Sequence, residues 1–221
     1  MSDRQERDQT RVWMQQLPSG DVRVESPLYH ADLPSMMAIN DDAGADTAGG
    51  VALAELPLQA HLVIRGRAEA PGFQESLTQA LGLQVPTRLS SVSDGSQTLR
   101  WIGPDEWLLT APASQAFDIE TKLRAALPGH VAVVDVSGGN TILLLSGLHA
   151  RSVLKKSTSY DVSDRNFPLG KVVTTTMGKS QAVIRRVDEL GWELIIRRSF
   201  ADYLWLWLQD ASAEYGLSVH E

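Results

Sequence analysis

The chain has 221 residues, of which 43% are hydrophobic and 21% charged, enough for one sizeable domain or two small ones that share a core. Its formal net charge of −7 and the lack of a Lys/Arg block argue against nucleic-acid binding through phosphate groups. The chain has no cysteine, which excludes disulfides, thiolate nucleophiles, iron–sulfur clusters and cysteine-bound zinc.

The sequence lacks the signals of export and of membrane insertion. Met1–Arg11 alternates acidic and basic residues without an apolar core, unlike a secretory signal. Apolar runs such as Ile142–Leu145 are far too short to cross a bilayer. We therefore expect a soluble, cytoplasmic protein.

The first fifty residues differ in composition from the rest. Residues 1–25 are polar and show no periodicity, and Asn40–Gly50 (NDDAGADTAGG) has the composition of a loop. We predict that residues 1–50 form a flexible N-terminal arm and linker.

Residues 51–129 are predicted to form a first α+β module. Its strands are recognised by alternating apolar residues, and its helices by an apolar side that ends at Gly82 and at Pro128-Gly129. A tight turn is expected at Gly103–Glu106, because proline fixes the φ angle of a turn. In chain order the expected strand, helix, two strands and helix are His61–Arg67, Phe73–Leu81, Thr98–Ile102, Trp107–Ala111 and Gln115–Leu127.

Residues 130–221 are predicted to form a second, similar module. Its expected strands are Ala132–Val136, Thr141–Leu145, Gln181–Val187 and Trp192–Arg197, and a short helix spans Gly147–Lys155. Ser137–Asn140 is read as a turn, and Ser199 as the cap of a last helix. The chain is thus expected to be an α+β protein of two similar β-α-β-β-α modules, whose antiparallel sheets carry helices on one side and which pack as one globular unit.

The last helix is apolar on more than one side. Trp205 and Leu206 lie well off its main apolar stripe, at 100° per residue. Either both belong to the core, or at least one of them faces another chain. The stripe itself consists of Phe200, Tyr203, Leu204, Trp207, Leu208 and Ala211.

A search for chemistry in the sequence finds no convincing site. The five histidines show no HxH or HExxH pairing, so a metal site has little support. Gly178-Lys179-Ser180 ends like a phosphate-binding loop, but Val173 occupies the position of the required upstream glycine. We predict no catalytic, cofactor-binding or metal-binding residue in this chain.

Four arginines are predicted to gather on one hairpin. Arg185-Arg186 and Arg197-Arg198 are expected to lie beside each other across this hairpin, where they would form a local basic patch. This patch either binds an acidic partner or balances the acidic chain.

Several motifs resemble those of one family. They include Gly103–Leu109 (GPDEWLL), Val134–Ser137 (VDVS), Phe167–Gly170 (FPLG) and, most specifically, Arg198–Leu208 (RSFADYLWLWL). Together with weaker matches they run from Ser26 to Leu217 and resemble the gamma subunit of heterotetrameric bacterial sarcosine oxidase.

This resemblance implies a non-catalytic structural subunit of an oxidoreductase complex, inactive alone. The complex converts sarcosine to glycine and hydrogen peroxide, and releases formaldehyde or methylene-tetrahydrofolate. FAD, FMN, NAD and tetrahydrofolate are then expected in the alpha, beta and delta partner subunits, and none in this chain. The alternatives are a stand-alone folate-binding or aminomethyl-transfer protein, and an assembly factor for the flavoenzyme.

The resemblance also implies a fold related to the folate-binding aminomethyltransferase of the glycine cleavage system. Those enzymes carry an acidic residue after a glycine in the corresponding strand. Here Gly178 is followed by residues 179–184 (KSQAVI), which contain no carboxylate. The sequence therefore predicts a relative of that fold without its working acid.

Overall fold

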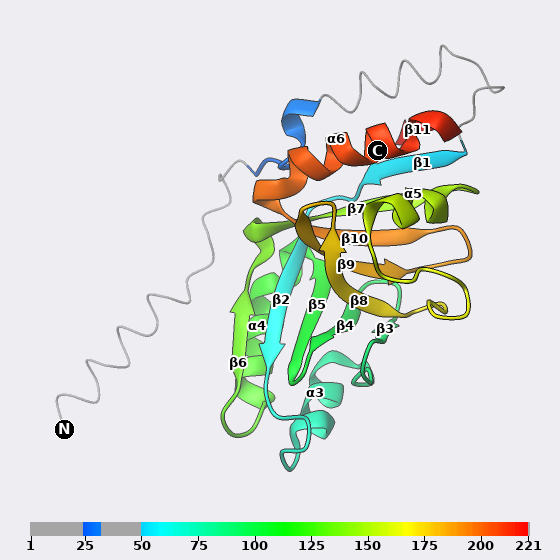
Figure 1. The fold of residues 1–221 in the computed structure, drawn as a ribbon. Coiled ribbons are helices and arrows are strands. Elements are labelled where there is room, and N and C mark those ends of the chain that lie inside the picture. The colour runs from blue at the N-terminus through cyan, green and yellow to red at the C-terminus, as the bar shows by residue number, and fades with distance from the viewer. Residues whose placement is uncertain (1–23, 32–49, 221) are drawn as a thin grey trace, which may run out of the picture.

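The computed structural model describes residues 24–31 and 50–220, which contain two sheets, each covered by two helices (Figure 1). The five-stranded sheet has the order β3-β4-β5-β2-β6, and the six-stranded sheet the order β11-β1-β7-β10-β9-β8. The strands are β1 Val51–Glu55, β2 Gln59–Arg65, β3 Ser91–Ser93, β4 Thr98–Gly103, β5 Glu106–Pro112, β6 Ala132–Asp135, β7 Asn140–Ser146, β8 Val172–Met177, β9 Ser180–Arg186, β10 Trp192–Arg197 and β11 Leu217–His220.

The α-helices are α3 Phe73–Leu81, α4 Ala116–Ala126, α5 Ala150–Ser157 and α6 Ala201–Ser212. Short 3₁₀ helices span Tyr29–Ala31, Ala113–Gln115, Ser137–Gly139, Arg198–Phe200 and Ala213–Tyr215. Neighbouring strands are antiparallel except β1 and β11, which are parallel. The predicted α+β fold with antiparallel sheets is confirmed.

The two modules exchange a strand. In each sheet the module's first strand has a neighbour on both sides, and on one side β2 pairs with β5 and β7 with β10. On the other side of β2 lies β6, which in the chain comes just before β7, the first strand of the second module. On the other side of β7 lies β1, which in the chain comes just before β2, the first strand of the first module. The chain therefore crosses between the sheets twice, through residues 56–58 and 136–139. Sheet membership does not follow the expected boundary between residues 129 and 130, because β1 and β6 each complete the other module's sheet.

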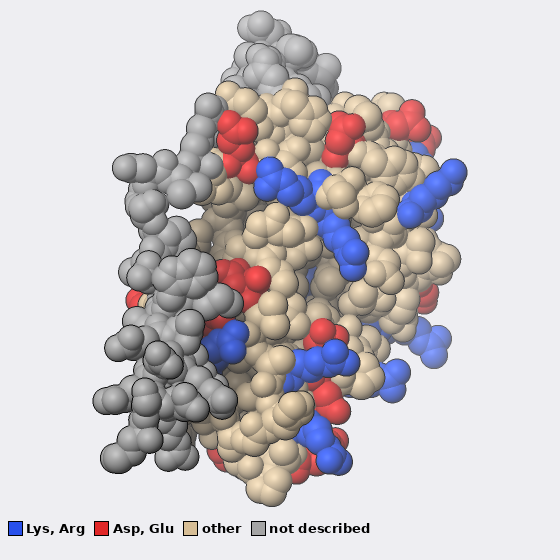
Figure 2. Space-filling view, turned by 90° about the vertical axis from the view of Figure 1, so that its left-hand side faces the viewer, with Lys and Arg blue, Asp and Glu red and all other residues tan. Residues whose placement is uncertain are grey.

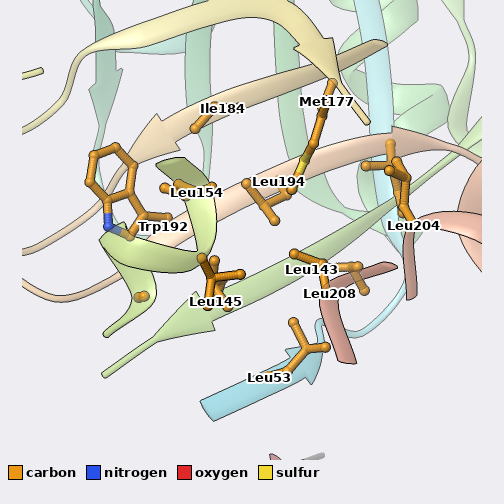
Figure 3. Packing of buried hydrophobic residues seen from close by; sticks show 14 of the residues in the cluster. Leu53, Leu143, Leu145, Leu154, Met177, Ile184, Trp192, Leu194, Leu204 and Leu208 are labelled. Atoms are coloured by element: carbon orange, nitrogen blue, oxygen red, sulfur yellow. The ribbon is translucent and has the colours of Figure 1, made fainter. Parts of the chain in front are cut away.

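The outer face of each sheet is apolar and covered by helices. Under α5 and α6, the side chains of Leu154, Leu204 and Leu208 pack over the six-stranded sheet (Figure 3). The sheet contributes Leu53, Leu143, Leu145, Met177, Ile184, Trp192 and Leu194. The helices α3 and α4 cover the five-stranded sheet in the same way, burying Phe73, Leu77, Leu123 and Leu127 against Leu62, Ile64, Leu99, Trp107, Leu109 and Val133.

Local signals in the sequence explain several element ends. Gly82, in the left-handed conformation with φ 73°, ends α3 where the sequence predicts. The predicted turn at Gly103–Glu106 joins β4 to β5, and Asp105 (φ 56°) accepts backbone N–H bonds from Gly66 and Ala68. The predicted cap at Ser199 is wrong, because α6 begins after Phe200 without a side-chain cap bond.

Part of the predicted arm packs against the six-stranded sheet. Leu28 is 1% exposed within its core, and the Ser26 hydroxyl donates to the Glu55 carboxylate at the end of β1. His30 Nε2 lies 2.8 Å from Asp202 Oδ1 of α6. Residues 24–31 are thus tied to the domain, whereas residues 1–23 and 32–49 of the predicted arm lie outside the described part.

Candidate functional site

The inner faces of the two sheets meet at a joint that is only partly apolar. Leu108 from the five-stranded sheet packs against Ile142 and Ile195 from the six-stranded sheet. Next to this small cluster lie charged side chains from both sheets. The joint is therefore the first place to look for a site, because the outer faces are filled by the helices.

Three charged residues link the two sheets across the joint. Arg100 of β4, 1% exposed, donates from Nη2 to Glu193 Oε2 of β10 over 2.6 Å. Arg185 of β9 lies directly opposite Glu193 and donates from Nη1 to both of its carboxylate oxygens, each over 3.1 Å. Further donors tie the arginines back to the five-stranded sheet, since Arg100 also reaches Thr110 Oγ1 over 2.7 Å and Arg185 reaches Ser91 Oγ over 3.0 Å.

The pKa of Glu193 shows which effect dominates in this cluster. Burial by itself would raise the pKa of Glu193, but the guanidinium groups of Arg100 and Arg185 outweigh it and hold that pKa below its ordinary value. The carboxylate is thus ionised at neutral pH, and both of its oxygens are engaged. It holds the sheets together and is poorly suited to moving a proton.

His61 of β2 is a second buried ionisable group beside the joint. Burial, reinforced by the charge of Arg100, lowers its pKa to about 4, although Asp135 acts in the opposite sense. Neither ring nitrogen has a hydrogen-bond partner among the described residues. The imidazole is therefore neutral at physiological pH and behaves as a core side chain.

A cavity of about 550 Å³ opens beside the joint, between the two sheets. Its walls carry Val63, Ile102 and Leu108 from one sheet and Val183 and Ile195 from the other. Among the described residues, the one carboxylate in its lining is Glu106, from the five-stranded sheet. The cavity is large enough for a small ligand, but its chemistry is mostly apolar.

The segment after Gly178 contributes no acid to this cavity. Gly178 forms the turn into β9, and of the following residues Gln181, Ala182 and Val183 line the cavity. The turn is fixed from outside, because the Lys179 N–H donates to the Tyr203 hydroxyl of α6 over 3.1 Å. The turn and strand β9 thus contribute no carboxylate to the cavity, in line with the sequence of residues 179–184.

Trp205 and Leu206, the two residues proposed for a partner interface, have opposite environments. Trp205 is 1% exposed and lies in the core of the six-stranded sheet, so it cannot present a surface to another chain. Leu206 is 56% exposed. Only Leu206 therefore remains a candidate for the predicted interface on α6.

The predicted arginine patch does not form. In the β9–β10 hairpin Arg185 faces Glu193 and Arg186 faces Trp192, near the turn. Arg197 lies at the far end of β10, beyond the pair formed by Ile196 and Ala182. The two arginine pairs are at opposite ends of the hairpin because its strands are antiparallel.

In the described part of the chain, neither the charges of the face that Figure 2 shows nor the placement of His, Asp and Glu side chains indicates a specialised binding surface. On the face shown in Figure 2, basic and acidic side chains are interspersed and form no basic block. Among residues 24–31 and 50–220, no group of three His, Asp or Glu side chains could hold a metal ion. No helix in these ranges is long and apolar enough to cross a membrane.

Sequence reasoning missed the cluster of Arg100, Arg185 and Glu193. The available signal was a charged residue within an otherwise apolar strand, as at Arg100 between Leu99 and Trp101. Such a residue must either face solvent or find a partner, but the sequence does not say which partner. Arg100 and Glu193 are 93 positions apart.

The two-sheet fold is that of the aminomethyltransferases. Aminomethyltransferase T of the glycine cleavage system from Bartonella henselae superposes with a TM-score of 0.62 over 89% of this chain and 59% of its own, at 14% identity. This likeness shows the fold alone. It confirms the fold class expected from the sequence.

The sequence comparisons place the chain in one family among the proteins that share this fold. Residues 65–214 match the model of the sarcosine oxidase gamma subunit family, and the chain belongs to that family. The sarcosine oxidase subunit gamma of Corynebacterium sp. (strain P-1) is 34% identical over 179 residues, which cover 78% of this chain and 85% of that one. A chain of heterotetrameric sarcosine oxidase from Corynebacterium sp. U-96, in complex with pyrrole 2-carboxylate, superposes with a TM-score of 0.76 at 28% identity, covering 87% and 96%.

Proposed function

We propose that this chain is the non-catalytic structural subunit of a cytoplasmic, flavin-dependent sarcosine oxidase built with alpha, beta and delta chains. Those chains hold FAD, FMN, NAD and tetrahydrofolate and convert sarcosine to glycine, with hydrogen peroxide and formaldehyde or methylene-tetrahydrofolate as further products. This chain supplies surfaces for assembly.

The observation that carries the proposal is the state of Glu193. It is the largely buried carboxylate of the joint; Arg185 binds both of its oxygens, and Arg100 also binds Oε2. A general acid or base needs a pKa near the working pH, whereas these arginines move the pKa of Glu193 further below it. We therefore assign Glu193 a structural role in holding the two sheets together.

The lining of the inter-sheet cavity argues against a folate site in this chain. Its apolar walls could accept a flat ring, but β9 offers Gln181, Ala182 and Val183 where the related enzymes use an acid. Glu106 comes from the opposite sheet. The residues present do not fit a folate site of that type, and we assign no step of folate chemistry to this chain.

Co-expression with the alpha, beta and delta chains of the same organism tests the proposal. We expect a stable complex that contains this chain in stoichiometric amount, and a purified single chain that is colourless and has no oxidase activity. A stoichiometric, fully active oxidase that lacks the chain would overturn the structural role.

Two further measurements address the alternatives. Titration of the isolated chain with tetrahydrofolate should show no binding, whereas micromolar affinity would favour a folate-binding protein. Subunit analysis of the mature oxidase should retain the chain, and its loss from the finished complex would favour an assembly factor.

A further inference from the structure

A cavity of about 470 Å³ opens where the two modules meet, between residues 88–91 at the start of β3 and residues 165–171 before β8 (Figure 1). Among the residues that the structure describes, its lining holds three cations, Arg88, Arg165 and Lys171, and no carboxylate. Leu169 also lines the cavity and is 57% exposed. Such a cationic, partly apolar hollow stands out on a chain with 27 acidic and 20 basic residues.

Main-chain bonds hold the two sides of the cavity together. The Gly170 carbonyl oxygen accepts the N–H of Ser91 over 3.0 Å and the hydroxyl of the same residue over 2.8 Å. The Val172 N–H donates to the Leu89 carbonyl oxygen over 3.0 Å. The backbone around the cavity is thus preorganised, which lowers the ordering cost of binding a partner.

The cavity lies at one end of the charged joint. Ser91 Oγ accepts a hydrogen bond over 3.0 Å from Nε of Arg185, the same arginine that binds Glu193. One side of the cavity comes from the first module and the other side from the second. A partner seated here would therefore contact both modules at once, in the arrangement that the joint specifies.

Two of the three cations have no partner. The side chains of Arg88 and Arg165 are exposed and form no ion pair or hydrogen bond with any described residue. Lys171 differs, because Asp161 lies close enough for the two charges to act on each other. The carboxylate next to Arg165 in the chain, Asp164, is engaged by two other arginines. The two unpaired arginines therefore dominate the charge of the cavity.

Leu169 is the residue of the Phe167–Gly170 motif that the fold does not explain. Phe167 is fully buried in the core of the six-stranded sheet, and Gly170 has a left-handed φ of 74°, which favours glycine. Leu169, by contrast, presents its side chain to solvent. An apolar side chain displayed by a fixed loop beside arginines has the composition of an interface centre.

We propose that this cavity docks an acidic segment of another subunit, which sets carboxylates against Arg88 and Arg165 and an apolar side chain against Leu169. The inference rests on the proposed function and identifies a surface that performs it. Charge complementarity selects the occupant, because cations without carboxylates attract an acidic surface and repel a basic one. Arginine suits this role, since its guanidinium group binds a carboxylate through two parallel hydrogen bonds.

Competition between chains tests the two charges. Parent and variant are co-expressed together with the alpha, beta and delta chains, the complex is purified through a tag on the alpha chain, and mass spectrometry measures the retained ratio of variant to parent. Arg88→Glu and Arg165→Glu should each be retained about tenfold less than the parent, because carboxylates then face carboxylates. Arg67→Glu makes the same charge change at an exposed arginine outside the lining and should compete equally. An equal loss in this control would show a response to net charge alone and would overturn the inference.

Leu169→Asp tests the apolar contact in the same competition. It should be retained about tenfold less than the parent, because a carboxylate then occupies an apolar contact. Leu148→Asp, at a 77% exposed leucine outside the lining, is the matched control and should compete equally. The isolated variants should unfold at the parent's urea midpoint, because the substituted side chains are exposed. This separates lost docking from lost folding.

Parent-like retention of Arg88→Glu, Arg165→Glu and Leu169→Asp would overturn the inference while leaving the proposed function intact. Loss of retention in Leu148→Asp or Leu206→Asp alone would place the interface on another face and would overturn it as well. Self-association of the isolated chain that Arg88→Glu abolishes would assign the cavity to a second copy and would overturn the choice of another subunit. Absence of the parent chain from the purified complex would contradict the proposed function itself.

Discussion

The six-stranded sheet has two faces that contribute to stability by different means. Under α5 and α6 its outer face buries a continuous apolar cluster, in which Leu204 and Leu208 of α6 pack against the strands (Figure 3). On its inner face, Glu193 and Arg185 meet Arg100 of the other sheet beside only a small apolar cluster. Apolar burial stabilises by the area removed from water, whereas a buried ion pair stabilises little unless every partner is present.

This difference teaches that the joint specifies how the modules meet rather than how strongly they fold. The apolar outer cores would tolerate small shifts of one module against the other. The Arg100–Glu193 bond of 2.6 Å would not, because displacing either partner leaves a buried charge unpaired. The exchanged strands β1 and β6 act in the same direction, since each ties one module's chain into the other's sheet.

The largest expected effect lies in the outer core. Trp205→Ala should lower the free energy of unfolding by about 3–5 kcal/mol, because it leaves a large cavity under α6. Leu206→Ala, one position along the same helix and 56% exposed, is the control and should change it by less than about 0.5 kcal/mol. Urea unfolding measures both. Similar losses for the two variants would contradict the placement of Trp205 in the core.

The joint should respond next. Glu193→Gln removes the charge that compensates Arg100 and should cost about 3 kcal/mol in urea unfolding, the lower end for breaking a buried pair. Glu189→Gln, at an exposed carboxylate of the hairpin turn, should cost less than about 0.5 kcal/mol. Replacing both members, by Arg100→Met with Glu193→Leu, should cost less than Glu193→Gln because no guanidinium is left fully buried. A harmless Glu193→Gln would show that water reaches the joint.

The pH dependence of stability isolates His61. Its pKa is about 4 in the folded chain and 6.5 in the unfolded one, so between these values the unfolded chain binds the proton that the folded chain refuses. The contribution of His61 is therefore complete above pH 6.5 and is lost as the pH falls toward 4, by up to about 3 kcal/mol. His61→Leu should flatten this part of the profile, and little should be lost near neutrality because neither ring nitrogen has a described partner.

The profile is measured by urea unfolding across this range. His130→Leu, at an exposed position, is the control and should follow the parent at each pH. The lowered pKa of Glu193 also destabilises the folded chain in acid, but only as the pH falls below that group's ordinary value of 4.5. A parent profile that stays flat between pH 6.5 and 4.5 would contradict the assignment to His61.

The sequence predicted the outer cores far better than the joint. Alternation located β2, β4, β5, β7, β9 and β10, and helical periodicity located α3 to α6, because both patterns are local. It missed β1, and also β3 and β11, which are only three and four residues long. It missed β8 as well, where three threonines mask the alternation. It also placed Trp205 off the apolar stripe, although the buried side of α6 is centred between Leu204 and Trp205.

The joint could not be predicted because its contacts are not local. The exchange of β1 and β6 depends on which sheet each strand joins, and the pattern of a strand does not encode its neighbours. Likewise the charge of Arg100 is compensated by a residue 93 positions away. The family motifs were readable without this knowledge, since residues such as Asp105 serve turns that the sequence does predict.

A smaller effect is expected where α6 touches the β8–β9 turn, because a polar side chain of the helix there constrains a glycine. Gly178 has φ 56°, and a Cβ there would lie 2.7 Å from the Tyr203 hydroxyl. Gly178→Ala should therefore cost about 2 kcal/mol, partly from left-handed backbone strain and partly from displacing the hydroxyl that accepts the Lys179 N–H.

The Tyr203→Phe background separates these two causes. Without the hydroxyl, Gly178→Ala should cost only the strain of about 1 kcal/mol, so the two substitutions should be less than additive in urea unfolding. Full additivity would show that the hydroxyl does not constrain residue 178. In that case the glycine is required by the backbone alone, and the outer layer would be held to the turn without polar specificity, in sharper contrast to the joint.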